Sequence, residues 1–361
     1  MTERYCYREV LPFTAMVAIE CTNVGVNVLF KAATVKGMGY YAFVAYSFAI
    51  STLFLLLPLP FVFRRSRELP PLNLSLIFRI FSLGVIGLTA QLCGYKGLNY
   101  TSPTLASSLS NLIPAFTFIL AIIFRMEKVA LRSSSTQAKI LGSFVSVAGA
   151  LVVLLYKGPK IFSTPSPTVH SPMLSSSQTN WVLGGSLLAV EYFLVPIWYI
   201  VQTSIMKEYP AEFIVVFLYN LSGTLLSAPI CFLLEGNLRA WKLNPDVTLI
   251  SVIYSGFFCT GLSSLVHTWG LHLKGPVYIS IFKPLSIVVA AVCSVLFLGE
   301  ALYFGTVLGA VILSFGFYAV IWGKAKEEDL CEDFDMRPPS SSKSPLLLSH
   351  KGKDKEEGNL C

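Results

Sequence analysis

Long apolar runs separated by short polar segments extend along most of the chain. Each run has about 20 residues, which at 1.5 Å per residue is enough for one helical crossing of a bilayer. Backbone groups in lipid must find partners within their own segment, and these runs are too long for the strands of a barrel. The pattern therefore predicts ten transmembrane helices, over residues 10–30, 40–63, 76–97, 103–124, 137–156, 181–202, 212–234, 247–268, 276–298 and 301–322.

Three segments fall outside the apolar runs. Residues 1–9 are short and mixed in charge, residues 157–180 are rich in Ser and Pro, and residues 324–361 are polar. We predict a cytoplasmic N-terminus, an extramembrane linker and a disordered cytoplasmic tail, respectively. Because the linker separates five spans from five, the sequence also predicts two membrane domains, 10–156 and 181–323.

The Lys and Arg residues indicate the direction of the spans. With the N-terminus inside, the inner segments hold about twice as many of these residues near the membrane as the outer loops, which is the positive-inside bias. We therefore expect both termini in the cytoplasm. The run that begins at Val10 is too long for the apolar part of a cleavable signal, and we interpret it as the first span.

Composition narrows the function classes. The chain has 361 residues, of which 54% are hydrophobic and only 13% charged, whereas soluble domains are about a quarter charged. The net charge of +7 lies mostly in short loops between spans, where membrane orientation requires it, so nucleic-acid binding is not expected. Most of the eight cysteines lie inside apolar runs and none joins a Cys/His cluster with metal spacing. We therefore expect neither a disulfide framework nor a metal or other cofactor.

The two halves of the chain repeat each other weakly but in order. At an offset of 171 residues Glu20 matches Glu191, and at an offset of 173 Pro103 matches Pro276. The offset changes only at loops, as expected when span lengths are kept. Because five is odd, the second half enters the membrane from the opposite side. Inverted repeats with a site near the midplane are typical of secondary transporters, although duplication can also simply build a larger bundle.

Three stretches resemble a known family. They are LFKAATVKGMGYYAFVAYSFAISTLFLLLP, TSPTLASSLSNLIPAFTFILAIIFRMEKV and KGPVYISIFKPLSIVVAAVCSVLFLGEALYFGTVLGAVIL, which contain the paired endings FRME and FLGE. They resemble the plant nodulin-21-like, or walls-are-thin-related, transporters (UMAMIT-type). These transporters belong to the EamA branch of the drug/metabolite transporter superfamily. The resemblance runs from about residue 10 to 325.

This resemblance implies an all-α integral membrane protein with ten helices in two inverted EamA repeats. It implies a plant origin and a place in the plasma membrane or the vacuolar membrane. It also implies facilitated or proton-linked movement of amino acids or of related metabolites such as auxin. The implied partners are thus a small-molecule solute, the lipid bilayer and protons, while the oligomeric state is left open.

Three ionisable side chains lie deep within predicted spans: Glu20, Glu191 and Lys283. Such residues cost about 2.5–3.5 kcal/mol each at a helix centre on insertion scales, and they therefore point to function. As repeat equivalents, the two glutamates are expected to face a shared central space. Lys283 either pairs with one of them or meets a substrate carboxylate. Our hypothesis is that Lys283 binds a substrate carboxylate, while Glu20 or Glu191 binds its amine or a coupling proton.

Polar and aromatic residues at helical spacing extend this set. Asn23 and Asn27 follow Glu20 on one helical face, and Trp198 shares a face with Glu191. Each of them also fits ordinary packing between membrane helices. The further candidates for substrate binding or coupling are Gln91, Ser107 and Asn111, with His267 a weaker one.

Prolines predict breaks within two spans. Pro103 lies in the first turn of its span, where a missing N–H has no cost. Pro114 lies in the middle of the same span and Pro284 in the middle of its repeat equivalent, so we expect a hinge or gate in each. Ser107 and Asn111 are expected either to bond the freed backbone groups or to face the transport path.

An enzyme and a receptor are the rival classes. The chain lacks HExxH, GxSxG, a P-loop and a clustered Asp/His site, so we do not expect an enzyme. A membrane receptor or scaffold without transport stays open as an alternative of another class. Among transporters, an exporter of auxin-like or other plant metabolites is the alternative to an amino-acid transporter.

Overall fold

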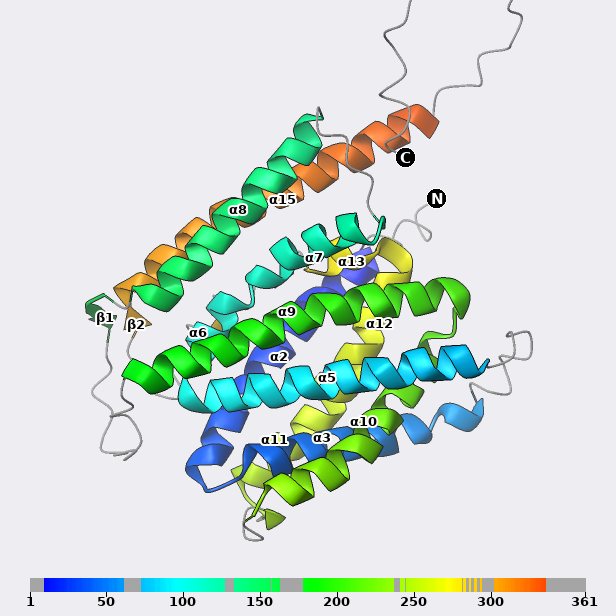
Figure 1. Ribbon diagram of the computed structural model, residues 1–361, viewed down its shortest axis with the longest axis vertical. Coiled ribbons are helices and arrows are strands. Elements are labelled where there is room, and N and C mark those ends of the chain that lie inside the picture. Colours follow the sequence, from blue (N-terminus) through cyan, green and yellow to red (C-terminus); the bar gives the residue numbers. More distant parts are fainter. Residues whose placement is uncertain are drawn as a thin grey trace, which may run out of the picture.

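The computed structural model describes residues 10–61, 73–126, 133–156, 158–162, 178–236, 241–243, 245–280 and 302–335, and between the last two ranges residues 282, 283, 286, 289, 290 and 293. Long helices make up most of this part, as the apolar runs predict (Figure 1). The predicted N-terminal segment 1–9 and the tail beyond residue 335 lie outside the described residues.

The helices follow the order of the predicted spans. Those of the first half are α2 (Leu11–Val35), α3 (Tyr40–Leu56), α5 (Leu74–Tyr100), α6 (Pro103–Leu109), α7 (Leu112–Ile123) and α8 (Ser134–Leu155). Those of the second half are α9 (Gln178–Glu208), α10 (Glu212–Leu234), α11 (Val247–Tyr254), η3 (Ser255–Ser263), α12 (Ser264–Lys274), α13 (Pro276–Ser280) and α15 (Phe304–Asp335).

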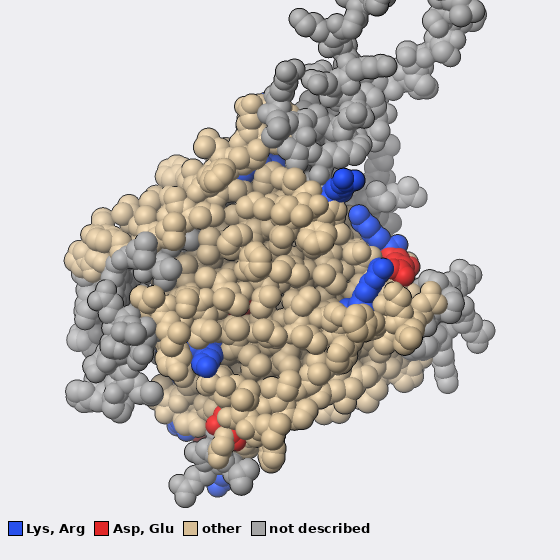
Figure 2. Space-filling view, viewed as in Figure 1, with Lys and Arg blue, Asp and Glu red and all other residues tan. Residues whose placement is uncertain are grey.

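The surface of the helix bundle suits lipid. Large apolar side chains are exposed on several helices, among them Phe78, Phe144 and Phe315. Figure 2 shows a face with few charged residues, most of them toward the ends of the helices. Soluble monomers rarely expose apolar surface on this scale. The structure therefore supports a protein embedded in a membrane.

Six helical stretches of the described part are long and apolar enough to cross a membrane: Leu11–Val35, Leu74–Tyr100, Pro103–Ile123, Val182–Glu208, Glu212–Leu234 and Val247–Lys274. Tyr40–Leu56 and Val307–Val320 are apolar but shorter. The structure thus supports several crossings of the bilayer, whereas the count of ten helices stays a prediction.

Spans that the repeat makes equivalent pack against each other. α3 lies against α10 and α8 against α15, which are the second and fifth spans of the two halves. The third span of the first half, α5, packs on the first span of the second half, α9. Correspondingly, α11 and η3 of the third span of the second half pack on α2, the first span of the first half. In Figure 1, α8 and α15 form a pair at one edge of the bundle. Two halves related by an axis in the membrane plane would be arranged in this way.

Small residues let two of these helix pairs approach closely. Where α5 crosses α9, a Cβ atom added to Gly97 would lie only 2.8 Å from the carbonyl oxygen of Gly184. Where α8 meets α15, Gly142 and Gly316 face each other in the same manner. Small residues at helix crossings are the usual means of close packing in membranes. The α5–α9 contact matters most for function, because both helices line the central cavity.

Two predicted spans are not continuous α-helices. The span predicted over 103–124 is interrupted at Ser110 and Asn111, between α6 and α7. The span predicted over 247–268 contains η3, a π-helix of nine residues. Interruptions of this kind occur frequently at functional sites. Both of them contribute to the wall of the central cavity.

Two further features differ from the sequence prediction. Among the described residues the fold is all-helical as predicted, apart from one short strand pair in which β1 (Lys160–Phe162) lies antiparallel to β2 (Leu302–Tyr303). The linker predicted over 157–180 therefore contains a short strand bonded next to the start of α15. The tail predicted to be disordered from residue 324 begins as helix, because α15 continues to Asp335. Backbone hydrogen bonds can order polar residues beyond an apolar run, so apolarity alone misplaces such boundaries.

Candidate functional site

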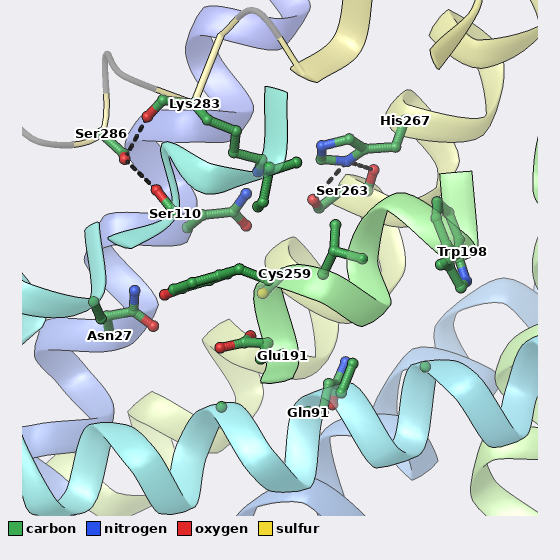
Figure 3. Close-up of a pocket in the computed structure, with 18 of the residues that line it drawn as sticks. Asn27, Gln91, Ser110, Glu191, Trp198, Cys259, Ser263, His267, Lys283 and Ser286 are labelled. Carbon is green, nitrogen blue, oxygen red and sulfur yellow. Dashed lines mark hydrogen bonds between the residues drawn. The ribbon is translucent and has the colours of Figure 1, made fainter. Parts of the chain in front are cut away.

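A cavity of about 230 Å³ lies where the two halves of the chain meet (Figure 3). Its wall comes from α2, α5, α6 and α7 of the first half and from α9, α10, η3 and α12 of the second, together with Lys283 and Ser286. Eight of the nine residues predicted for substrate binding or coupling line it: Glu20, Asn23, Asn27, Gln91, Ser107, Glu191, Trp198 and Lys283. The ninth, Asn111, does not.

An ion pair between the two halves lies in this wall. Lys283 Nζ donates to Glu20 Oε1 at 2.6 Å, and the two side chains are 11% and 2% exposed. Of the partners that the sequence left open for Lys283, the structure places the lysine on Glu20. Removing one partner of a buried pair leaves the other charge without compensation, which costs about 3–5 kcal/mol. The pair therefore ties α2 to the second repeat.

His267 presents a hydrogen-bond acceptor beside this pair. Its Nδ1 lies 2.7 Å from the carbonyl oxygen of Ser263, and because a carbonyl can only accept, Nδ1 carries the proton in this contact. Nε2 lies 3.9 Å from Glu20 Oε1 and has no hydrogen-bond partner among the described residues. The imidazole stacks on Tyr199, with ring centroids 5.9 Å apart. A neutral His267 therefore points an unsatisfied lone pair toward Glu20.

The interruption at Ser110 meets the segment that follows α13 next to Lys283. The hydroxyl of Ser286 donates to the carbonyl of Lys283 at 2.6 Å, and the hydroxyls of Ser286 and Ser110 lie 3.4 Å apart. Figure 3 shows this chain of contacts. At the offset of 173, Ser110 and Lys283 are repeat equivalents, so these contacts join matching places of the two repeats. Discontinuous helices at such a site are typical of inverted-repeat transporters. The predicted hinge Pro284 lies outside the described residues.

Side chains satisfy the backbone at the interruption of the first repeat. Ser110 Oγ donates to the Ser107 carbonyl at 2.7 Å, and Asn111 Nδ2 donates to the carbonyls of Ser108 at 3.0 Å and Ser107 at 3.3 Å. The last carbonyls of a helix lack amide partners. Asn111 is 2% exposed and outside the cavity wall, so of its two expected roles the structure supports the bonding of freed backbone groups.

Pro114 does not lie in the middle of a continuous helix, as the sequence predicted. It is the third residue of α7, within the first turn, whose N–H groups have no partner inside the helix. In a continuous helix its ring would clash with the carbonyl of Ser110, four residues earlier. The helix is interrupted at Ser110 and Asn111 and begins again at Leu112. The predicted break is thus present ahead of the proline, and a hinge role for Pro114 stays a prediction.

Glu191 reaches the cavity on the side away from Lys283 (Figure 3). It packs against α5 at Gly94, where an added Cβ atom would overlap its carboxyl group. In the part of the chain that the structure describes, this carboxyl makes no ion pair and no hydrogen bond. The two repeat-equivalent glutamates therefore share one cavity but have different surroundings.

Five buried polar atoms of the cavity wall have no hydrogen-bond partner within the described residues: Asn23 Oδ1, Gln91 Oε1, Trp198 Nε1, Thr260 Oγ1 and His267 Nε2. Folded proteins satisfy nearly all buried polar groups, with protein or with water. The five include a donor, the indole N–H, and acceptors such as the amide oxygens. Their concentration around one cavity indicates a site for polar ligands.

Two segments of the chain, residues 14–155 and 183–322, match the EamA-like transporter family. Together they cover most of the sequence. The chain belongs to this family. Each matched segment corresponds to one half of the EamA fold described above, and the cavity lies between the two.

WAT1-related proteins of Arabidopsis thaliana are similar to this EamA protein over nearly its whole length. At5g40240 and At4g15540 are each 54% identical over 354 residues, covering 96% and 98% of this chain and 94% and 97% of their own. At3g28050 is 49% identical over 364 residues, covering 97% of this chain and 99% of its own. The predicted resemblance to walls-are-thin-related transporters is confirmed. This EamA protein is a multi-pass membrane transporter of the drug/metabolite type.

The fold also recurs among solved structures. One, described only as a crystal structure of a protein, aligns with a TM-score of 0.58 and 14% identity, covering 87% of this EamA chain and 99% of its own. At this identity the likeness shows the fold alone.

Sequence reasoning missed part of the cavity wall of this EamA protein. Cys259, Thr260, Ser263 and Ser264 line it from η3 and α12, and they lie close to His267 in sequence. A run of small polar residues within the apolar segment 247–268 is a signal that could have found them. The aromatic wall of the cavity consists of Tyr95, Tyr192, Trp198, Tyr199 and Tyr219. Of these, Tyr199 and Tyr219 were missed, because they lie on two helices that no local pattern connects.

Polar contacts tie the helices of the EamA fold together at both ends. At the end of α5, Lys31 Nζ donates to the carbonyls of Leu98, Asn99 and Thr101 at 3.1, 3.1 and 2.6 Å. At the opposite end of the bundle, Arg79 pairs with Glu208 at 2.7 Å. Among the described residues, no group of three or more His, Cys, Asp or Glu side chains is placed to hold a metal.

One carboxyl at the start of α11 has a shifted pKa. The backbone N–H of Thr248 donates to Asp246 Oδ1 at 2.9 Å, and Lys36 Nζ lies 3.7 Å from Asp246 Oδ2. The N–H bond, helped by the lysine, holds the pKa of Asp246 below its usual range. The carboxylate form caps the helix, since it accepts from an N–H that has no partner within the helix.

Proposed function

We propose that this EamA protein is a secondary transporter of small organic solutes, most directly amino acids, which it moves by alternating access at the cavity between its repeats. The observation that supports this most is the Glu20–Lys283 ion pair, which joins the two repeats in a wall of unsatisfied polar atoms. An ion pair with a purely structural role would not require unsatisfied polar atoms around it.

The charges of the site complement those of an amino acid. Lys283 matches a carboxylate, while Glu20 and the lone pair of His267 Nε2 match an ammonium group. A zwitterion that comes between Glu20 and Lys283 replaces one ion pair by two, so no charge is left uncompensated in the membrane. At about 230 Å³, the cavity is below the range of about 300–1,000 Å³ that drug-sized ligands occupy. A small solute therefore suits it better than a large one.

The position of the pair supports alternating access. Glu20 lies on α2 of the first repeat and Lys283 follows α13 of the second, so a solute bound to both contacts both halves. In inverted-repeat transporters the halves rock against each other around a fixed site. A solute that bonds both halves stabilises a closed state in which the cavity is shut off from either side.

The aromatic wall favours a second candidate solute. Tyr95, Tyr192, Trp198, Tyr199 and Tyr219 surround the cavity, and aromatic side chains pack well against planar rings. An exporter of auxin-like acids would use Lys283 for the carboxylate and this wall for the ring. Such an acid brings no ammonium group, so Glu20 would have no role in its recognition. A receptor or scaffold is the candidate of another class, and it would move nothing.

We propose the plasma membrane or the vacuolar membrane as the location and the cytoplasm for both termini. The orientation rests on the Lys and Arg bias of the loops.

A labelled panel of amino acids, indole carboxylates and purines tests the function. It is applied to oocytes that express the protein, at two external pH values, with uptake and efflux both recorded. We expect an amino acid to be moved, and we expect Lys283→Ala and Glu20→Gln each to reduce its transport while the protein stays at the membrane. Transport of no solute would favour the receptor, and unchanged rate and apparent affinity in both variants would refute the proposed site.

A further inference from the structure

Among the residues that the structure describes, Glu20 has a cation beside it and Glu191 has none. We propose that Glu191 binds and releases the coupling proton of this transporter, while Glu20 and Lys283 serve the solute. The proposal rests on the proposed transport function and assigns roles that the sequence leaves open between the two acids.

Glu20 has its own counter-charge. With Lys283 Nζ at 2.6 Å from its Oε1, the pair adds no net charge to the membrane interior. A zwitterionic solute that enters between the two brings one positive and one negative charge, so the sum stays at zero. Glu20 is therefore balanced in the empty and in the loaded transporter without a proton.

Glu191 has no such partner. In the described part of the chain no Lys, Arg or His nitrogen lies within 4.0 Å of its carboxyl. The group lies in the cavity wall against the backbone of α5, where Gly94 leaves room for it. A carboxylate in the membrane interior is strongly disfavoured without a counter-ion, and a bound proton removes its charge.

The repeat explains why the cation is missing. Glu20 and Glu191 are equivalent at an offset of 171, and Ser110 is equivalent to Lys283 at an offset of 173. A lysine at position 110 would therefore be related to Glu191 as Lys283 is related to Glu20. The chain has a serine there instead, whose hydroxyl bonds to the Ser107 carbonyl at 2.7 Å. A bound proton would give Glu191 the charge balance that Lys283 gives Glu20.

The other titratable groups near Glu191 do not compete for this role. They are Cys93 and Tyr95 on α5, Tyr192 on α9 and Cys259 on η3, with Glu20, Lys283 and His267 across the cavity. Phenol and thiol groups are ordinarily neutral at pH 7. An imidazole ordinarily titrates near neutrality, so His267 is the rival proton site and provides the matched control.

The proton step involves no bond other than the one to the carboxyl oxygen. Glu191 takes a proton from the solution on one side, the cavity closes with no net charge, and the carboxyl returns the proton to the solution on the other side together with the solute. A loaded transporter with an ionised Glu191 would have to carry a net negative charge through the closed state, so the protonated form is the one that reorients with solute bound. For one proton to move per solute, the empty transporter then returns with Glu191 ionised.

Proteoliposomes with purified protein test the assignment, with labelled phenylalanine as the probe. Accumulation is measured with the outside about one pH unit more acid than the inside, which at one proton per solute supports about tenfold accumulation. Exchange is measured at equal pH against unlabelled phenylalanine. We expect the wild type to show both activities. Glu191→Gln should keep exchange but lose accumulation. His267→Gln alters the solute site instead, so it should lower exchange and accumulation in proportion.

Ser110→Lys is the second variant. It supplies to the first repeat the cation that Glu191 lacks, so we expect it to abolish acid-driven accumulation. If Glu191→Gln does not fold, this variant tests the assignment of Glu191 as the proton site. The proposal would be overturned if Glu191→Gln still accumulated phenylalanine against the pH gradient. It would also be overturned if folded Glu191→Gln lost exchange as well as accumulation. Exchange by the wild type without any response to pH would overturn it too, while leaving the transport function intact. Failure of the wild type to move any solute of the panel would instead refute the transport function.

Discussion

The two repeats have equivalent helices but give the cavity different charges. The first repeat contributes Glu20 and, at its interrupted span, the neutral Ser110. The second contributes Glu191 and, at the equivalent place, the cation Lys283. Within the described part of the chain the cross-repeat pair forms between Glu20 and Lys283, and no equivalent pair forms at Glu191.

This difference shows how a duplicated fold can separate two tasks. A fully symmetric protein would have two ion pairs and would treat the two sides of its cavity alike. With one pair and one unpaired acid, one side can bind the two charges of a solute and the other can respond to protons. Four substitutions test this division. They follow in the order of their expected free-energy effect, from the largest to the smallest.

Lys283→Ala should have the largest effect, because it leaves the buried Glu20 without its cation. Breaking such a pair costs about 3–5 kcal/mol, so we expect a loss of solute transport of about a hundredfold or more. Uptake per folded protein at the membrane measures it. Lys283→Met combined with Glu20→Gln is the control, since it removes both charges, and it should recover thermal stability but not transport. Recovery of transport as well would mean that the pair is only structural.

Gly94→Ala disturbs the unpaired side and should have the next largest effect. The added methyl group would overlap the carboxyl of Glu191, and overpacking of this kind costs about 1–3 kcal/mol. We expect a lower unfolding temperature and a weaker response of transport to external pH. Gly236→Ala is the matched control, because a Cβ atom there has nothing within 4 Å. An unchanged pH response in Gly94→Ala would argue that Glu191 need not hold its present position.

Asn111→Ala tests the neutral interruption of the first repeat. It removes two hydrogen bonds to the carbonyls of Ser107 and Ser108, and each such bond contributes about 0.5–1.5 kcal/mol. Thermal stability should fall, while the apparent affinity for the solute should change little, since Asn111 is outside the cavity wall. Thr89→Ala on an exposed helix face is the control. A large change in affinity with stability intact would place Asn111 in the binding site after all.

Trp198→Phe should have the smallest effect, and it separates a ligand-binding role from a structural one. The indole N–H has no partner among the described residues, so its removal breaks no hydrogen bond within that part of the protein. A hydrogen bond from that N–H to the solute would contribute about 0.5–1.5 kcal/mol. We therefore expect the apparent affinity to fall by about two- to tenfold. Titration of solute transport measures it, and an unchanged affinity would remove Trp198 from the contact surface.

The sequence predicted those parts of the site that local patterns encode. Glu20, Glu191 and Lys283 were identifiable because ionisable residues are rare inside spans, and the repeat predicted that both acids reach one cavity. The partner of Lys283 was not predictable, because Glu20 and Glu191 are equivalent in sequence and only the packing of the helices distinguishes them. The place of the break was also predicted wrongly. Pro114 predicts a break in the helix, but the interruption lies at Ser110, four residues before the proline.

Other features depend on contacts between distant segments. Tyr199 and Tyr219 line the cavity from α9 and α10, and neither shows a pattern that sets it apart from ordinary packing. The strand pair β1–β2 joins residues about 140 apart in the chain, and its few hydrogen bonds leave no periodic signal in so short a segment.

The π-helix η3 has a consequence for motion. A π-helical segment holds more residues per turn than an α-helix does, and each residue of an α-helix turns its face by about 100°. If the π geometry shifted by one residue along the span, a side chain such as Thr260 would turn toward or away from the cavity while Asp246 and Lys274 kept their places. The span could then exchange one polar face for another by rotation within itself. Spin labels on either side of η3 would report such a change as altered side-chain mobility at constant distance.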